Sequence, residues 1–242
     1  MPIDLATIIA QINDMAGRVD PALNVERFRA LSAAWEELDS REVNARYTDA
    51  KTSFLLAKSD GDYRERSPLP SIPETYSVVA TDGSFILPDR HSPARFYVLN
   101  LGSVLLSYGR EPSADISASC RICYEEHDLV VPDDPQRTRI DGTVLGFRRA
   151  IDELQAASDR LSGVTSPAVA LQDGTLILWQ LQGQTEPVSR WVLGQYLDVL
   201  DEFRERDQAI ASYISAPGAT ELMNMLRVSV CDYPDHGMTI NC

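Results

Sequence analysis

Two short segments of the sequence share one pattern. TDGSFIL occupies residues 81–87 and QDGTLIL occupies residues 172–178, so Asp-Gly-(Ser/Thr) followed by apolar residues is written twice. No similarity surrounds the two copies, which argues against an internal repeat. Each aspartate lies in an apolar run rich in β-branched residues, which is typical of a strand. The pattern therefore predicts two separate strands that each carry an aspartate followed by glycine.

The elements around these two segments follow a definite order. Apolar runs with β-branched residues predict strands, and apolar residues at spacings of three and four predict helices. In chain order we expect strands over 76–87, 95–109 and 118–131, a helix over 140–161, a strand over 168–182, a helix over 189–208, a strand over 209–215 and a helix or helix-like turn over 220–231. Short connections make the first three strands an antiparallel meander, and the helix that follows allows a crossover to a parallel strand.

This order predicts an α/β fold with an RNase H-like core, in which a mixed sheet has three antiparallel strands and then a βαβ crossover. The first and fourth strands are neighbours in that arrangement, so Asp82 and Asp173 would lie side by side. An Asp-Gly pair is most often part of a turn. Both pairs here are flanked by apolar residues, which the tip of a hairpin does not require.

The first 74 residues differ from the rest of the chain. Apolar residues recur at helical spacing from Leu5 to Met15 and again from Phe28 to Val43. Residues 59–74 contain three prolines among polar residues, as a loop or linker does. We therefore divide the chain into an N-terminal helical region and linker over 1–74, a core domain over 75–231 and a tail over 232–242.

The chain is acidic, with a formal net charge of −14. This is the wrong sign for a protein that holds nucleic acid by overall electrostatic attraction. The charge suits a site that binds cations, a protein that relies on a partner for nucleic-acid affinity, or an ordinary acidic soluble protein. No apolar run reaches about 18 residues and no basic N-terminal signal precedes one, so we expect a cytoplasmic protein without a membrane segment.

The four cysteines give little support for a metal site. Cys120 and Cys123 form one C-x-x-C pair, but a structural zinc site usually needs a second close pair. Cys231 and Cys242 are eleven residues apart (242 − 231). We expect reduced thiols at all four positions.

The two aspartates suit the chemistry of phosphodiester cleavage. Two divalent cations about 4 Å apart can activate the attacking water, neutralise the phosphate and stabilise the leaving oxygen. Such hard cations bind oxygen ligands, above all carboxylates. We prefer Glu153 as a third carboxylate, because it lies on a lane of small residues that would let its helix approach the sheet. Asp152 is the alternative, and a glutamate on a helix is more often simply solvated.

Other polar residues give weaker signals. The acidic residues of 125–128 could form a fourth ligand group, although the polar end of a strand explains them as well. His91, His127 and His236 show no metal-ligand spacing, and His91 could contact a phosphate or serve the structure. The sequence lacks the G-x-S-x-G, P-loop and G-x-G-x-x-G patterns, which disfavours serine hydrolases and nucleotide-binding enzymes of those types.

Several segments resemble the NurA nuclease domain. The stretch VVATDGSFILPDRHSPARFYVLNLGSVLLSYG resembles the family's first motif region. The helix with Glu153, followed by VALQDGTLIL, is similar to the second and third motifs, and SYISAPGATELMNMLRVSVC resembles a later Y-I-S-x-P segment. The similarity runs from about residue 76 to 231, and Arg90 and His91 lie in the matching first motif without an assigned role.

The resemblance implies a nuclease that works as a homodimer with manganese, or with magnesium as the alternative. It implies endonuclease action on single-stranded DNA and 5′-3′ exonuclease action in DNA end resection and repair, alongside a hexameric HerA-type ATPase. By position, Asp82, Glu153 and Asp173 would be both the catalytic residues and the metal ligands. The family continues into a C-terminal segment with a tyrosine and a histidine. This chain stops at Cys242, so we expect either a fragment or a short member.

Three functions stay open at this point. The first is a metal-dependent DNA nuclease. The second is a catalytically incomplete NurA-like scaffold that dimerises or docks on a partner ATPase, which the shortened C-terminus favours and three clustered carboxylates disfavour. The third is an RNase H-like enzyme that acts on RNA.

Overall fold

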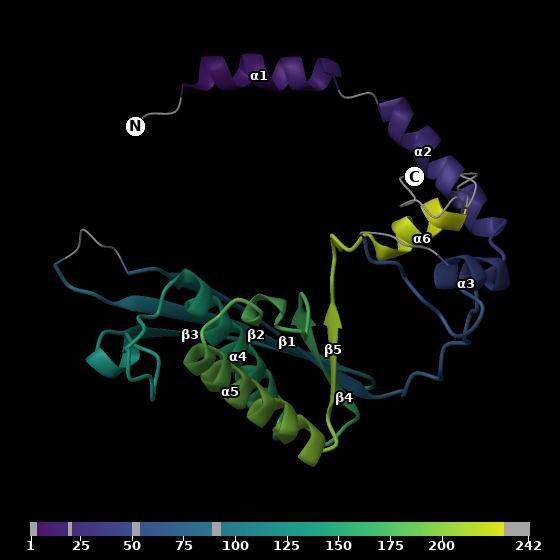
Figure 1. Ribbon diagram of the computed structural model, residues 1–242. Helices are drawn as coiled ribbons and strands as arrows, with labels where there is room; N and C mark the ends of the chain where they lie inside the picture. Colours follow the sequence, from purple (N-terminus) through teal and green to yellow (C-terminus); the bar gives the residue numbers. More distant parts are fainter. Residues whose placement is uncertain (1–3, 19–20, 50–53, 89–92, 230–242) are drawn as a thin grey trace. The chain divides into compact units, whose positions relative to one another are not determined.

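The structure is a computed structural model that describes residues 4–18, 21–49, 54–88 and 93–229. Contacts divide the chain into two compact units. One is drawn from residues 1–69 and 218–242, and the other from residues 70–217 (Figure 1). The core domain predicted over 75–231 overlaps the second unit along most of its length.

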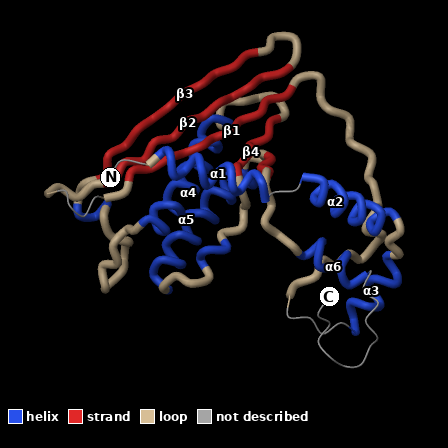
Figure 2. Tube along the Cα trace, turned by 90° about the horizontal axis from the view of Figure 1, so that it is seen from above, coloured by secondary structure: helices blue, strands red, loops and turns tan. Residues whose placement is uncertain are grey.

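The second unit contains a five-stranded mixed sheet. Its strands are β1 (Tyr76–Ile86), β2 (Tyr97–Tyr108), β3 (Ser113–Cys123), β4 (Ala168–Asp173) and β5 (Ala209–Tyr213), in the order β3-β2-β1-β4-β5. β2 pairs antiparallel with β1 and β3, whereas β4 pairs parallel with β1 and β5. Figure 2 shows the long strands β1, β2 and β3 running side by side. The predicted meander and the predicted crossover to a strand beside β1 are therefore confirmed.

Two long helices, α4 (Gly142–Leu161) and α5 (Glu186–Glu205), lie on one side of this sheet (Figures 1 and 2). The carboxylate of Asp141 caps α4 by accepting the backbone N–H groups of Thr143 and Val144, each at 2.9 Å. The main core fills the space between helices and sheet. It takes up the predicted apolar stripe of α4, whose members Val144, Phe147, Ile151, Leu154 and Leu161 are all buried. Each such side chain contributes about 1.5–3 kcal/mol through burial.

Side chains alternate between the two faces of the sheet. Along β1, Val79, Thr81 and Gly83 are buried against the helical layer, whereas Asp82 and Ser84 are exposed. β3 is exposed along its whole length except at its last residue. Among the described residues of this unit, the helices thus cover one face of the sheet and leave alternate residues of the other face accessible.

Two strands have boundaries that differ from the prediction. β3 begins at Ser113 rather than at residue 118, because an exposed edge strand needs no apolar alternation to pair with its neighbour. It ends at Cys123, and the short 3-10 helix η1 (Glu126–Asp128) follows. β4 ends at Asp173 rather than continuing to residue 182. The reason is Gly174, whose φ of +89° turns the chain before the 3-10 helix η2 (Trp179–Leu181).

The first unit is helical, as predicted for the N-terminal region. It contains α1 (Leu5–Arg18), α2 (Pro21–Glu36), α3 (Ser40–Asp49) and the late helix α6 (Glu221–Ser229). Leu38 and Val43 form a small core with Met225 and Leu226 of α6. α1 buries none of its side chains. Within the ranges that the structure describes, none of the helices combines the length and the apolar character needed to cross a lipid bilayer.

Candidate active site

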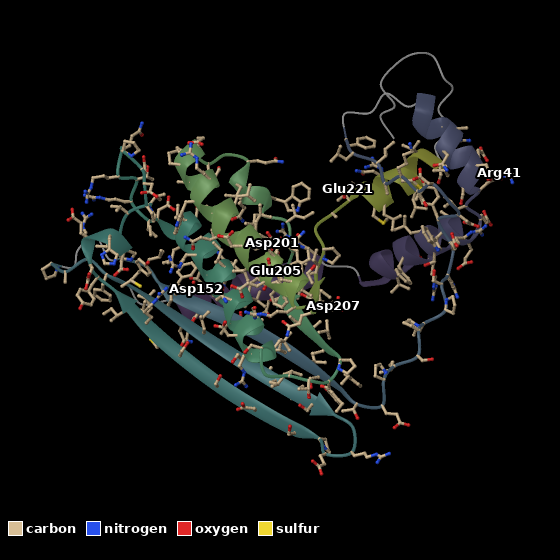
Figure 3. The ribbon with its side chains drawn as sticks, turned by 90° about the horizontal axis from the view of Figure 1, so that it is seen from below. Arg41, Asp152, Asp201, Glu205, Asp207 and Glu221 are labelled. Carbon is tan, nitrogen blue, oxygen red and sulfur yellow. The ribbon has the colours of Figure 1, made fainter. Side chains whose placement is uncertain are left out.

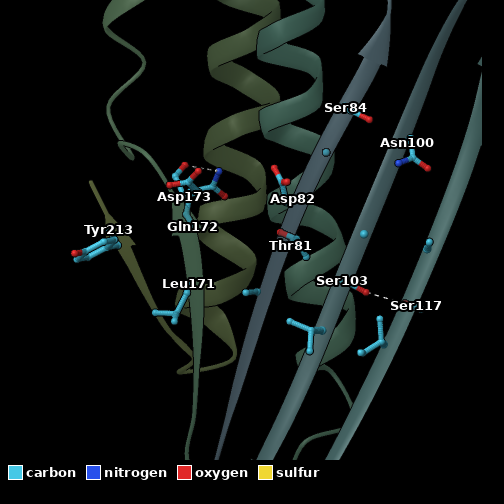
Figure 4. Close-up of a pocket in the computed structure, with 16 residues that line it drawn as sticks. Thr81, Asp82, Ser84, Asn100, Ser103, Ser117, Leu171, Gln172, Asp173 and Tyr213 are labelled. Atoms are coloured by element: carbon cyan, nitrogen blue, oxygen red, sulfur yellow. Dashed lines mark hydrogen bonds between the residues drawn. The ribbon is translucent and has the colours of Figure 1, made fainter. Parts of the chain in front are cut away.

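The two aspartates of the repeated pattern lie on neighbouring strands. The pairing of β1 with β4 runs to Thr81 opposite Gln172, and Asp82 and Asp173 are the next residue on each strand. Both side chains are exposed, whereas the residue before each of them is buried. Because side chains alternate along a strand, Asp82 and Asp173 point to the open face of the sheet (Figure 4). The adjacency expected from the strand order is present.

A groove of about 700 Å³ runs over this face and contains both aspartates. Ser84 and Asn100 add polar groups to its lining. Towards the opposite ends of the strands the lining becomes apolar, with Ala80, Val104, Ile116 and Leu171, and Tyr213 borders the groove on β5. The groove therefore joins an acidic, polar part to an apolar part.

Glu153 lies on the other side of the sheet. It is buried on α4, with only 3% of its surface exposed. Its Oε2 accepts a hydrogen bond from Gln172 Nε2 at 3.1 Å, and its Oε1 lies 3.3 Å from Arg149 Nε. Its backbone carbonyl accepts the hydroxyl of Thr81 at 2.8 Å. Glu153 is thus tied both to its own helix and to the two strands that carry the aspartates.

The surroundings of Glu153 favour its neutral form. Burial raises the pKa of the Glu153 carboxyl, and the negative charge of Asp82 adds to this rise. The guanidinium of Arg149 and the hydrogen bond from Gln172 oppose it without cancelling it.

The two glycines of the repeated pattern do different things. A Cβ at Gly83 would lie 2.8 Å from Glu153 Oε1 and 2.9 Å from both Arg149 Cγ and Leu101 Cδ2. The carboxylate of Glu153 therefore reaches β1 only because residue 83 has no side chain. A Cβ at Gly174 would meet nothing within 4 Å, but its φ of +89° is one that favours glycine. The first pair is a close approach within a strand, and the second is the turn that ends one.

The donor set fits a hard cation in its chemistry. Asp82 and Asp173 supply adjacent carboxylate oxygens, and Glu153 Oε1 is buried without a hydrogen bond of good geometry. One positive group already lies beside Glu153. Arg149 pairs with its carboxylate and donates from Nη1 to Gly83 O at 3.0 Å. Among the described residues, however, no group of three His, Cys, Asp or Glu lies within reach of one ion. Asp82 and Asp173 are the pair that could hold a metal directly, with Glu153 behind them.

The alternative third carboxylate, Asp152, has other partners. Asp152, labelled in Figure 3, pairs within α4 with Arg148 at 3.1 Å and with Arg121 of β3 at 3.0 Å. The ion pair with Arg121 links α4 to β3. Asp152 therefore serves contacts between helix and sheet in this structure.

The remaining acidic and basic candidates lie elsewhere. Residues 125–128 form η1 and its cap, where Glu126 pairs with Arg137, and none of them lines the groove. Cys120 is exposed and Cys123 is buried, and both are free thiols. The candidates Arg90, His91, His236, Cys231 and Cys242 lie outside the described residues.

Three residues of this region were not singled out from the sequence. Gln172 carries a signal in hindsight, because it precedes an exposed aspartate on a strand and must face the helices. Arg149 stands four residues before Glu153, which is the spacing of a helical ion pair. Tyr213 ends a short strand whose position beside β4 only the sheet order reveals.

The strand order and the two aspartates together define a class of protein. A mixed sheet in the order β3-β2-β1-β4-β5, with a helix between β3 and β4 and carboxylates at matching positions of β1 and β4, is an RNase H-like α/β core. Within this class the chain belongs to the NurA family. The family model for the NurA domain matches residues 76–240, which is more than half of the chain. Family membership and the RNase H-like core support a nuclease, a hydrolase of phosphodiesters.

Several solved structures are similar to the chain. RNase H1 from the halophilic archaeon Halobacterium salinarum is 17% identical, with a TM-score of 0.32 over 60% of this chain and 89% of that chain. The N-terminal RNase H domain of Rv2228c from Mycobacterium tuberculosis is 18% identical, with a TM-score of 0.29 over 64% and 96%. The foamy viral protease-reverse transcriptase, in complex with an RNA/DNA hybrid, is 12% identical, with a TM-score of 0.35 over 66% and 20%. No curated protein matches the chain.

Proposed function

We propose that the chain is a metal-dependent DNA nuclease. The observation that carries the proposal is the pair of exposed carboxylates, Asp82 and Asp173, side by side on one face of the sheet and within one groove. Two like charges at neighbouring positions repel each other, so an ordinary surface has no reason to keep them together. A cation that binds between them relieves this repulsion.

The three predicted residues take distinct parts in this proposal. Asp82 and Asp173 would hold the metal directly through their carboxylate oxygens, and Glu153, which lies behind them on α4, is proposed as the third ligand by its match to the family motif. A bound pair of divalent ions supplies activation of the attacking water and stabilisation of the charge on the phosphate. Gly83 lets the carboxylate of Glu153 approach β1, and Gln172 holds that carboxylate in place at 3.1 Å. We propose manganese as the ion, with magnesium as the alternative.

The proposed substrate is DNA, with endonuclease action on single strands and 5′-3′ exonuclease action in end resection and repair. A net charge of −14 opposes binding to DNA over most of the surface. One cavity of about 490 Å³ has a net positive lining instead, because Arg95, Arg137 and Arg139 outnumber Glu126, which pairs with Arg137. We further propose a cytoplasmic homodimer and a hexameric HerA-type ATPase as the partner that delivers DNA to the acidic site.

A catalytically incomplete scaffold is the second candidate. It is favoured by one observation, that no three metal-ligating side chains converge among the described residues. In this function the chain would dimerise or dock on the partner ATPase, and Glu153 would stay paired with Arg149. A scaffold gives no reason for Asp82 and Asp173 to be adjacent, so we favour the nuclease.

The test is cleavage of 5′-labelled and 3′-labelled single-stranded DNA with Mn²⁺, with Mg²⁺ and with EDTA. We expect Mn²⁺-dependent cleavage that falls about 100-fold in Asp82→Asn and in Asp173→Asn, as loss of a metal ligand or its support does. Asp201→Asn, which alters an exposed aspartate on α5 (Figure 3), is the control and should keep full activity. Cleavage that survives both substitutions would refute the site. No cleavage by the unaltered chain would favour the scaffold, and cleavage of RNA alone would redirect the substrate assignment.

A further inference from the structure

The acidic part of the groove carries an exposed aromatic residue next to Asp173. Tyr213, the last residue of β5, is the pairing partner of Asp173 and is 70% exposed. Partners in a parallel ladder project to the same face, so its ring lies on the open face with Asp82 and Asp173. Figure 4 shows Tyr213 beside β4, on the same side of the groove as Leu171 and Asp173. An aromatic ring in water at the end of an edge strand has no evident role in the core.

The groove around Tyr213 is built for an amphipathic ligand. Tyr213 lies level with Asp173 in the pairing of β5 with β4, and Leu171, which is 39% exposed, lies two residues before Asp173 on the same face of β4. The acidic pair can therefore accept cations while the adjoining ring and Leu171 accept an apolar group. A nucleotide has this polarity, because it joins a flat base to a phosphate that needs a counter-ion.

We propose that Tyr213 is a stacking platform for an unpaired base of the substrate, next to the phosphate held at Asp82 and Asp173. This proposal rests on the proposed nuclease function and names the residue that would give that function its preference for single strands. Bases stack on aromatic rings whatever their sequence, because every base has a π-face. In a duplex both faces of a base are already occupied by its neighbours, so the platform selects single strands. Stacking also supplies affinity that the charge of −14 cannot.

The size of the effect follows from stacking. Removal of one aromatic platform costs about 1–3 kcal/mol per base, which is roughly a 5- to 150-fold loss of affinity. We expect Tyr213→Ala to raise the KM for single-stranded DNA within this range and to change kcat by less than about twofold, because the ring binds but does not react. Tyr213→Phe and Tyr213→Trp keep a π-face and should retain a KM near that of the unaltered chain.

The decisive experiment combines these variants with an abasic site moved along a labelled single strand. In the unaltered chain one position should be sensitive to loss of its base, and Tyr213→Ala should erase that sensitivity, since ring and base then act as one pair. Tyr124→Ala is the matched control, because Tyr124 is 62% exposed and lies outside the groove. Equal KM values for Tyr213→Ala and Tyr124→Ala, with no change in the abasic profile, would overturn the proposal.

Two further readouts separate this inference from its foundation. Binding of a fluorescent oligothymidylate in Ca²⁺, followed by anisotropy, tests the platform whether or not the chain cleaves DNA. If the unaltered chain does not cut but Tyr213→Ala still weakens binding, the platform stands and the nuclease falls. If neither binding nor cleavage occurs, both fall. If Tyr213→Ala changes only the oligomer size in sedimentation, a second copy of the chain covers the ring and the platform is refuted.

Discussion

Gly83→Ala is the most direct test of how Glu153 reaches β1. The new methyl group would lie 2.8 Å from Glu153 Oε1 and 2.9 Å from Arg149 Cγ and Leu101 Cδ2, which are all shorter than a normal contact. Adding one methyl to a well-packed site costs about 1–3 kcal/mol. Gly83 does not have a positive φ, so alanine also gains roughly 0.5–1 kcal/mol by restricting the unfolded chain. We expect a net loss of about 1–2 kcal/mol.

A second glycine gives the matched control. Gly194 lies within α5, and a Cβ there would meet nothing within 4 Å. Gly194→Ala should stabilise the chain by up to about 1 kcal/mol, because alanine is the better helix former. In urea unfolding, the free energies of unfolding of the two alanine variants should therefore differ by about 1–3 kcal/mol.

A double-mutant cycle identifies Glu153 as the side chain that is displaced. Glu153→Ala removes the carboxylate, so the methyl group of Gly83→Ala should then cost less. We expect a coupling free energy of at least about 1 kcal/mol between the two substitutions. In a folded Gly83→Ala variant, the metal-dependent cleavage should also fall, because Glu153 no longer lies against β1. If Gly83→Ala is as stable as Gly194→Ala and the coupling free energy is zero, the contact between Glu153 and residue 83 does not affect stability. That result would refute the reasoning.

Three further predictions concern metal, acid and the strand end. Mn²⁺ at about 100 times its dissociation constant should raise the melting temperature by roughly 5–10 °C, and Asp82→Asn and Asp173→Asn should abolish the rise without lowering the metal-free melting temperature. Hydrogen bonds from the side chain and backbone of Thr138 lower the pKa of Asp134. A lowered pKa gives stability that is present above the unfolded value and lost as pH falls through the folded value. Asp134→Asn should therefore flatten the acid side of a plot of urea midpoint against pH, and an unchanged plot would contradict this. The hydroxyl of Tyr196 donates to the backbone carbonyl of Leu176, in the segment after β4, at 2.9 Å. Tyr196→Phe should therefore lower the free energy of unfolding in urea by about 1 kcal/mol. An unchanged free energy of unfolding would mean that this hydrogen bond does not hold the segment.

The sequence predicted the strand order because periodicity changes clearly between the elements. The apolar stripe of α4 and the run around Asp82 each need a buried face, and the observed order packs α4 against β1. Strand ends were less predictable. β3 begins in the polar residues that start at Ser113, since an exposed edge strand is held by backbone hydrogen bonds rather than by apolar side chains. β4 ends at Asp173 because Gly174 has a positive φ that turns the chain. The apolar residues after Gly174 wrongly predicted that the strand would continue.

The position of Glu153 was predictable only in part. Small residues along one side of α4 predicted a close approach of this helix to the sheet. The approach occurs at Gly83, where a Cβ would lie 2.8 Å from Glu153 Oε1. The side of the sheet was not predicted, because it depends on the direction in which each residue of β1 and β4 projects. Asp82 and Asp173 project into the groove on the open face of the sheet. Glu153 lies on the opposite face, which the helices cover, where it bonds to Gln172. A ligand set drawn from both faces of a sheet leaves no spacing in the sequence by which it could be recognised.

The repeated pattern has a physical reason that extends beyond the aspartates. In each copy, the polar residue before the aspartate bonds to the same residue of α4. The hydroxyl of Thr81 donates to the backbone carbonyl of Glu153, and the amide of Gln172 donates to its carboxylate. Because neighbouring residues of a strand project to opposite faces, these two bonds also fix Asp82 and Asp173 on the open face. A shift of either strand by one residue would break its bond to Glu153 and bury a carboxylate against the helices, at a cost of several kcal/mol. Glu153 therefore adds to the register of β1 and β4 that the backbone ladders and the buried apolar residues already favour, and the same two bonds hold the acidic site together.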